Sequence, residues 1–98
     1  AAPTRRHWVG VKTILRYLQS TQDLGLSFPK DQAPTMVGYV DAGYMSDPHN
    51  ARSQTGFVFL CGGAAISWRS VKQTLVATST NHSEIIALYE AARECVWL

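Results

Sequence analysis

The sequence is short of cysteine, of long apolar runs and of net charge, and each shortage removes a class of protein. Its two cysteines, Cys61 and Cys95, lie far apart among 98 residues. Such a pair is neither a disulfide framework nor a metal knuckle, and it suits a reducing compartment. No apolar run approaches the roughly 20 residues that span a bilayer, and the start, AAPTRRHW, lacks the apolar core of a signal peptide. We therefore expect an intracellular protein, cytoplasmic or nuclear, with no membrane partner.

Motifs of several common sites are also missing. The formal net charge of +2 is too small to indicate nucleic-acid binding by itself. The Gly62-Gly63 pair does not precede a helix, so it is no phosphate-binding loop. The three histidines share no metal-ligand spacing with one another or with the cysteines, so we expect them at the surface. These absences argue against a phosphate-loop enzyme and a zinc site.

Hydrophobic residues make up 46% of the chain, which is enough for the core of one small domain. The first element that we expect is a helix over roughly 5–19, with Thr4 as its N-cap. Its apolar face recurs at spacings of three and four, at Trp8, Val11, Leu15 and Leu18, with Ile14 beside them. Its other positions include four basic residues, Arg5, Arg6, Lys12 and Arg16. A solvated polar face is the favoured interpretation, and a helix that faces phosphates is the alternative.

The middle of the chain reads as strands and turns. Alternating apolar residues predict a short strand over 24–28, and the composition of 29–34 predicts a turn. An apolar run, MVGYVDA, predicts a strand over 36–42, followed by a polar loop over 43–53. Strands over 56–61 and 64–69 flank Gly62-Gly63, which supplies the positive φ angles of a tight hairpin. Residues 36–69 therefore read as a three-strand antiparallel meander.

A connector over 70–80 leads to the last element, a helix over about 82–98 that Asn81 can cap. The helical spacing of its apolar residues predicts one buried face, made of Ile85, Leu88, Tyr89, Ala92 and Val96. The chain then stops inside an apolar pattern without a glycine, asparagine or proline that would end a helix. We interpret this end as a truncation.

Two carboxylates are candidates for chemistry. Asp41 occupies a strand position where an apolar residue would be the default, and it is either a catalytic carboxylate or a charge at the end of a strand. Glu84 follows Asn81 by three positions. It is either the partner of a capping box or a metal ligand that faces Asp41 across the helix and the sheet. Local sequence alone favours the structural role for each.

Four segments occur in a fixed order: GYVDAGY, DPHNARSQTGFVF, GGAAISWRSVKQ and STNHSEI. Together they strongly resemble the ribonuclease H region of copia-type (Ty1/copia) retrotransposon polyproteins, with plant elements the most similar. The matches cover 38–98. Upstream, HWVGVKTILRYLQSTQDLGLSF resembles the segment that joins reverse transcriptase to ribonuclease H. The resemblance thus divides the chain into a connector over 1–35 and a partial ribonuclease H-like domain over 36–98.

This resemblance implies an α+β, ribonuclease H-like fold, truncated after its first helix. The implied ancestral activity is hydrolysis of the RNA strand in an RNA–DNA hybrid, with two divalent ions, Mg²⁺ or Mn²⁺. The family's first two metal carboxylates fall on Asp41 and Glu84. Thr80 and Asn81 fall in the segment that meets the RNA minor groove, and Arg52 and Lys72 would contact backbone phosphates.

The chain departs from the family pattern in two ways that bear on activity and assembly. It ends before the third and fourth metal carboxylates, so we expect weak metal binding and little or no nuclease activity. The strand that would pair with the first strand is also missing, so that strand exposes an edge. We therefore expect a homodimer or larger assembly. The alternative function is a non-enzymatic module that a host has recruited to bind a protein or a nucleic acid.

Overall fold

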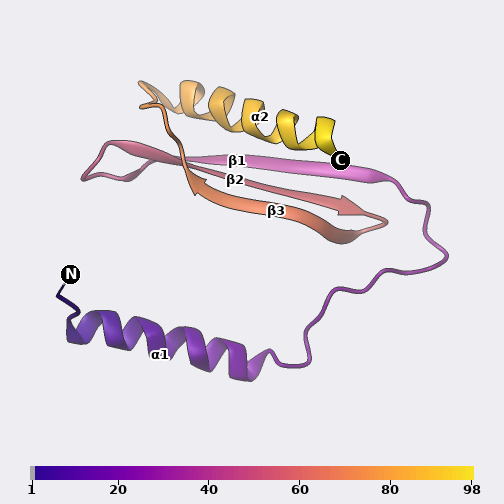
Figure 1. Cartoon of the computed structure of the whole chain (residues 1–98), viewed down its shortest axis with the longest axis horizontal. Coiled ribbons are helices and arrows are strands. Elements are labelled where there is room, and N and C mark those ends of the chain that lie inside the picture. The colour runs from indigo at the N-terminus through magenta and orange to yellow at the C-terminus, as the bar shows by residue number, and fades with distance from the viewer. Residues whose placement is uncertain (1) are drawn as a thin grey trace.

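The computed structural model describes residues 2–98 and contains two helices and one sheet (Figure 1). The order of elements confirms the expected α+β class, with a meander between an N-terminal and a C-terminal helix. Neither described helix is long and apolar enough to cross a membrane. The elements are α1 Arg5–Ser20, β1 Met36–Asp47, β2 Arg52–Cys61, β3 Ala64–Lys72 and α2 Thr80–Trp97.

The three strands form one antiparallel sheet in the order β1-β2-β3, as predicted. Val40 of β1 lies opposite Phe57 of β2, which in turn lies opposite Arg69 of β3. The hairpin between β2 and β3 turns at Gly62 and Gly63, whose φ angles of 56° and 81° are the positive values that glycine permits. In the sheet of the described residues, β1 is an edge strand, which confirms the exposed edge.

All three strands are longer than the sequence predicted, and β3 continues to Lys72 instead of ending at 69. Residues 43–47 were expected in a loop, but Gly43 pairs with Gln54 and Asp47 pairs with Arg52, with a register shift between them. The loop therefore shrinks to 48–51 and ends at Ala51, whose φ is 50°. Polar composition misled the prediction because one face of this sheet is open to solvent, where polar side chains cost nothing.

The prediction of a short strand over 24–28 is wrong. This segment is an irregular connector that no strand pairs, because the alternation of Leu24, Leu26 and Phe28 finds neither a neighbouring strand nor a core. All three side chains are exposed. The turn predicted at 29–34 does form, with turn and bend conformations at 30–32.

The buried face of α2 is not the one that the apolar spacing predicted. Three small residues, Ser83, Ala87 and Ala91, face the sheet and are buried. The expected stripe is largely exposed instead: Ile85, Leu88, Tyr89 and Val96 are 58–88% exposed, and only Leu88 and Ala92 border a hollow beside β1. Small side chains let the helix lie close above β1 and β2, where two phenylalanine rings already fill the space.

The N-cap of α2 also differs from the expectation. The helix begins at Thr80, and the Ser79 hydroxyl accepts a hydrogen bond from the His82 N–H at 3.1 Å. Asn81 therefore lies inside the first turn, and the capping-box role considered for Glu84 is wrong. A serine at the N-cap satisfies a free amide as well as asparagine does. N-cap preference alone therefore could not decide between Ser79 and Asn81.

The core beneath α2 is small. It joins Phe57, Phe59 and Ala91, with Val40 packed against them, and the two rings meet edge to face at 5.7 Å between centroids. Phe59 lies over Gly38, where an added Cβ would sit 2.5 Å from the ring atom Cε1. The absence of a side chain at Gly38 thus makes room for the ring.

Gln73 fastens α2 to the sheet. Its side chain is fully buried, and its amide nitrogen Nε2 donates to Thr55 Oγ1 of β2 at 3.1 Å and to the carbonyl oxygen of Ser83 at 2.9 Å. Its backbone N–H donates to the carbonyl of Ser53 at 2.8 Å. One residue of the connector therefore ties β2 to the first turns of the helix.

Helix α1 stands apart from the rest of the chain. It begins after Thr4, as predicted, and the Thr4 N–H donates to His7 Nδ1 at 3.0 Å. It contacts no other helix or strand among the described residues, and none of its residues is buried. In Figure 1 it lies on the side of the sheet away from α2, roughly along the strands.

We predict that Gln73→Leu lowers the free energy of unfolding by about 2 kcal/mol or more, because it leaves the Thr55 hydroxyl and the Ser83 carbonyl buried without a partner. Urea denaturation measures the loss. Gln54→Leu is the matched control, because Gln54 makes one exposed bond, to Ser70, and its change should stay within about 0.5 kcal/mol. Equal losses in the two variants would contradict the role of Gln73.

Candidate functional site

Asp41 lies near the middle of β1 and points away from α2. Its neighbours along the strand, Val40 and Ala42, turn toward the helix, where Val40 packs on the core and Ala42 is buried. Alternation along a strand then sends the Asp41 carboxylate to the opposite, open face. Asp41 is exposed there and lies across from Gly56, which leaves the carboxylate accessible to a ligand.

Glu84 lies on α2 and is partly buried. It is one helical turn before Leu88, which lines a shallow hollow beside β1 together with Val40 and Cys95. Glu84 therefore belongs to the side of the helix that overlooks the free edge of β1. The two predicted carboxylates approach β1 from opposite faces of the sheet.

This arrangement decides how well the chain fits a two-metal centre. An ion held by both Asp41 and Glu84 would have to lie beside the edge of β1, where each carboxylate reaches around the strand. Among residues 2–98, no group of three or more histidine, cysteine, aspartate or glutamate side chains could hold a metal ion. A pair of ions needs several carboxylates in fixed geometry, so the donors described here do not fit a two-metal centre.

The predicted minor-groove residues, Thr80 and Asn81, open α2 and are exposed. They follow Ser79 at the N-terminal end of the helix, where free amides and the helix dipole favour negatively charged groups. The Thr80 carbonyl accepts a hydrogen bond from the Ser83 hydroxyl, so it is already used within the helix. Both side chains remain available to a partner that approaches this end of the sheet.

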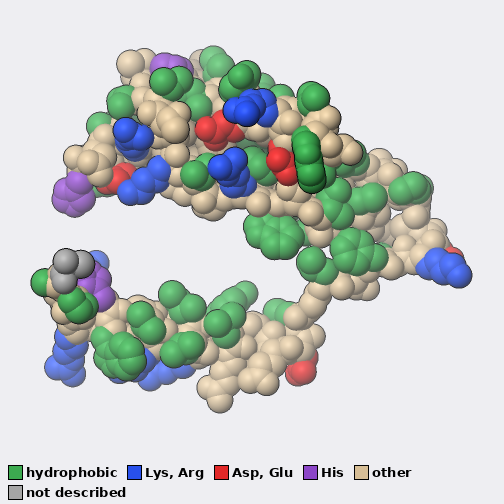
Figure 2. All heavy atoms as spheres, in the orientation of Figure 1, with side chains coloured by type: hydrophobic (Ala, Val, Ile, Leu, Met, Phe, Trp, Pro, Cys, Tyr) green, Lys and Arg blue, Asp and Glu red, His purple; other side chains and the backbone are tan. Residues whose placement is uncertain are grey.

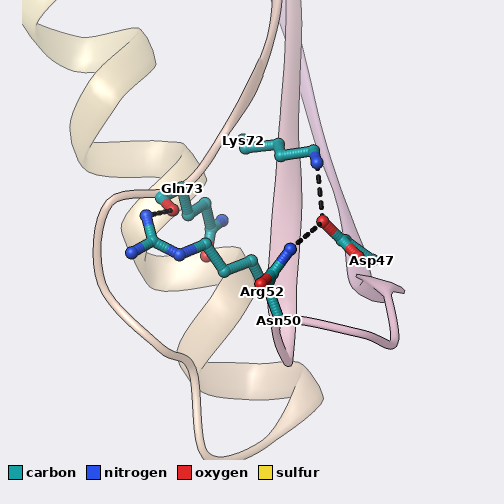
Figure 3. Close-up of polar contacts among 5 residues, drawn as sticks. All are labelled: Asp47, Asn50, Arg52, Lys72 and Gln73. Atoms are coloured by element: carbon teal, nitrogen blue, oxygen red, sulfur yellow. Dashed lines mark hydrogen bonds and ion pairs between the residues drawn. The ribbon is translucent and has the colours of Figure 1, made fainter. Parts of the chain in front are cut away.

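Arg52 and Lys72 lie at the same end of the sheet, but contacts within the chain already engage both (Figure 3). Arg52 Nη1 donates to the carbonyl of Gln73 at 3.3 Å. Lys72 Nζ lies 2.6 Å from Oδ2 of Asp47, and Asn50 also donates to that oxygen at 3.0 Å. A phosphate contact by Lys72 would compete with this ion pair, whereas Arg52 has further donors to offer.

A groove of about 520 Å³ runs between α2 and β3, and sequence reasoning missed it. Its lining includes two basic and two acidic side chains, Arg69, Arg93, Glu90 and Glu94. Glu94 accepts a hydrogen bond from the Ser67 hydroxyl at 2.5 Å, and Oε2 of Glu90 is buried without a partner. The spacing of Glu90, Arg93 and Glu94 on one helical side was the available signal. Its mixed charge selects no single class of ligand.

Comparison with known proteins shows which sequences this chain is related to. No family model matches the chain, and no solved structure is significantly similar to it. Over 96 residues it is 46% identical to the secreted RxLR effector protein 161 of Plasmopara viticola. Over the same length it is 44% identical to the retrovirus-related Pol polyprotein from transposon TNT 1-94 of Nicotiana tabacum, and 32% identical to that from transposon RE2 of Arabidopsis thaliana. Each match covers 98% of this chain.

The chain is thus an α+β module homologous to one region of the Pol polyproteins of Ty1/copia retrotransposons, mainly those of plants. It spans 7% of the tobacco and Arabidopsis polyproteins and 68% of the Plasmopara effector. Because it covers more than two thirds of the effector at 46% identity, it belongs to the same family as that protein. The comparisons give the similarity of the whole module and assign no role to single residues. The site roles therefore remain predictions for Asp41, Glu84, Thr80, Asn81, Arg52 and Lys72.

The carboxylate of Asp47 generates a prediction for stability against pH. Hydrogen bonds from Lys72, chiefly, and from Asn50 hold the pKa of Asp47 well below its ordinary value. A folded-state pKa below the unfolded value adds stability above the unfolded pKa, about 4 for aspartate, and this contribution is lost as the pH falls toward the folded value. At pH 7 we expect the urea midpoint of wild type to be higher than that of Asp47→Asn. The difference between the two midpoints should become smaller by pH 3.

Lys72→Met supplies the control for this prediction. Lys72→Met removes the ion pair with Asp47. In this variant, Asp47→Asn should change the urea midpoint at pH 7 less than it does in wild type, and the change should depend less on pH. A difference between wild type and Asp47→Asn that stays constant from pH 7 to pH 3 would count against the assignment.

Proposed function

We propose that this chain is a ribonuclease H-like module of retrotransposon origin that binds RNA–DNA hybrids and by itself cleaves them weakly or not at all. The observation that carries the proposal is homology over 98% of the chain to retrotransposon Pol polyproteins. The resemblance to copia-type ribonuclease H motifs supplies the finer assignment, because the family's first two metal carboxylates fall on Asp41 of β1 and Glu84 of α2.

The binding surface that we propose is the end of the sheet where α2 begins. Thr80 and Asn81 are exposed at the helix N-terminus, and their short polar side chains suit hydrogen bonds to 2′-hydroxyls in a minor groove. Arg52 has guanidinium donors left for a phosphate after its single bond to the Gln73 carbonyl. Only the RNA strand of a hybrid carries 2′-hydroxyls, so this surface would prefer a hybrid to a DNA duplex.

Weak cleavage follows from the placement of the acids. Hydrolysis in this family requires two divalent ions to activate a water and to stabilise the leaving oxygen. Asp41 and Glu84 approach β1 from opposite faces, and the described residues bring no third acid to them. We therefore propose that the described residues bind Mg²⁺ or Mn²⁺ weakly.

A second candidate function is a non-enzymatic module that binds another protein. It is favoured by the relative named as a secreted effector, of which the chain covers 68%, whereas it covers only 7% of the polyproteins. The exposed apolar stripe of α2 offers a surface of the kind that proteins use to bind one another. Hybrid binding distinguishes the two candidates.

The first experiment measures binding and cleavage of a labelled RNA–DNA hybrid at fixed ionic strength with Mg²⁺ or Mn²⁺. We expect binding tighter than that of the matching DNA duplex, with little or no cleavage. Asn81→Ala should weaken hybrid binding about fivefold, the cost of about 1 kcal/mol for a lost hydrogen bond. Gln19→Ala, an exposed amide on α1, should leave binding unchanged.

Two outcomes would overturn parts of the proposal. Rapid cleavage that Asp41→Asn abolishes would show that two carboxylates suffice for a working site, which contradicts the weak activity proposed here. Equal affinity for hybrid and DNA duplex, from protein shown to be folded by circular dichroism, would remove hybrid recognition and leave the protein-binding module as the better account.

We also propose that a second copy of the chain pairs with the free edge of β1, which is 12 residues long. Light scattering during size-exclusion chromatography at micromolar concentration should give about twice the monomer mass of 10.8 kDa. Tyr39→Lys should shift the mass toward monomer, because lysine on an edge strand opposes pairing. Tyr89→Lys, on the outward side of α2, is the matched control, and a wild-type monomer would refute the pairing.

A further inference from the structure

The face of the sheet opposite α2 is apolar over about half its length, at the end nearest the hairpin between β2 and β3. Alternation and register place Val37 beside Leu60, and Tyr39 in a row with Val58 and Trp68. Tyr39 and Trp68 are 59% and 64% exposed, and no described helix covers them. The next row, which contains Asp41, is polar. This surface, called the open face below, is the kind of apolar patch that soluble proteins cover.

Helix α1 carries an apolar stripe that fits within the length of the sheet. Trp8, Val11, Leu15 and Leu18 lie along one side and are 44–58% exposed. Sixteen residues make a helix of about 24 Å, and the ten residues of β2 span about 33 Å. Figure 2 shows the apolar side chains of α1 gathered mostly toward the sheet, across an open gap, with most of its Lys and Arg on the far side.

The exposed area and the radius of gyration of the chain are both larger than those of a compact monomer of the same mass. The described arrangement exposes 7871 Å², and a compact monomer of 10.8 kDa exposes about 5,500 Å². The excess of about 2,300 Å² is larger than a standard protein interface, about 1,600 Å², so it is enough to accommodate one such contact. The radius of gyration is 17.0 Å, against about 13 Å for a compact domain of this length.

We propose that α1 packs on the open face of its own sheet in solution and forms a second helical layer opposite α2. The connector over 21–35 is long enough, since it can reach about 50 Å when extended. In Figure 1, α1 already runs antiparallel to β1 on the side of the sheet away from α2, so no reversal of the helix is needed. The matches to the effector and to both polyproteins span 98% of the chain, so each includes α1 together with the sheet.

Hydrogen exchange of the α1 amides tests the proposal, because an isolated helix of 16 residues is marginally stable and exchanges quickly. We expect protection of 5–20 in wild type. Trp68→Ser should lower it about tenfold or more, since it removes the largest apolar side chain of the open face. Val96→Ser, on the outward stripe of α2, is the matched control and should leave α1 protected.

A variant pair on the helix tests the same contact from the other side. Leu15→Glu should remove protection, and Thr13→Glu, on the opposite side of α1, should not. Repeating the exchange over a hundredfold range of protein concentration separates the possible occupants. Protection that is independent of concentration supports docking within one chain, and protection that rises with concentration assigns the open face to α1 of a second copy. Fast exchange of α1 in wild type, or loss of protection in Val96→Ser but not in Trp68→Ser, would overturn the proposal.

Discussion

The fold depends on the hydrogen bonds of one buried amide. Gln73 leaves β3, turns inward, and binds β2 through Thr55 and α2 through the Ser83 carbonyl. Without those bonds the helix would rest on the sheet through Ala87, Ala91, Val40 and the two phenylalanine rings, with one further polar contact from Ser67 to Glu94. Small residues let the helix approach the sheet closely but bury little area. The hydrogen bonds of Gln73 therefore fix the position of α2 on the sheet, which apolar packing alone would not determine.

Much of the fold was predictable because its signals are local. Thr4, the glycine pair of the hairpin and the alternation in β2 each act within a few residues, and the structure confirms each element they indicated. The failures have a tertiary cause. The orientation of α2 depends on how closely a helix can approach Phe57 and Phe59, and a helical pattern cannot say which of two stripes the sheet will accept.

The candidate site was less predictable than the fold. Motif resemblance selected Asp41 and Glu84, but only the register of β1 shows that they approach the strand from opposite faces. The pairing of Lys72 with Asp47 joins residues 25 positions apart, which no local pattern reveals. The groove beside Glu90 and Arg93 exists because α2 lies over β1 and β2 and leaves β3 uncovered.

The contact between Phe59 and Gly38 limits how this sequence can diverge. A methyl group at Gly38 would meet a ring that α2 holds in place, so no other amino acid fits while the phenylalanine stays. The two positions can change only together, with a smaller residue at 59 arriving before or with a larger one at 38. Among homologues of this chain, this pair should therefore vary as a unit, while the exposed positions of α1 and α2 vary one by one.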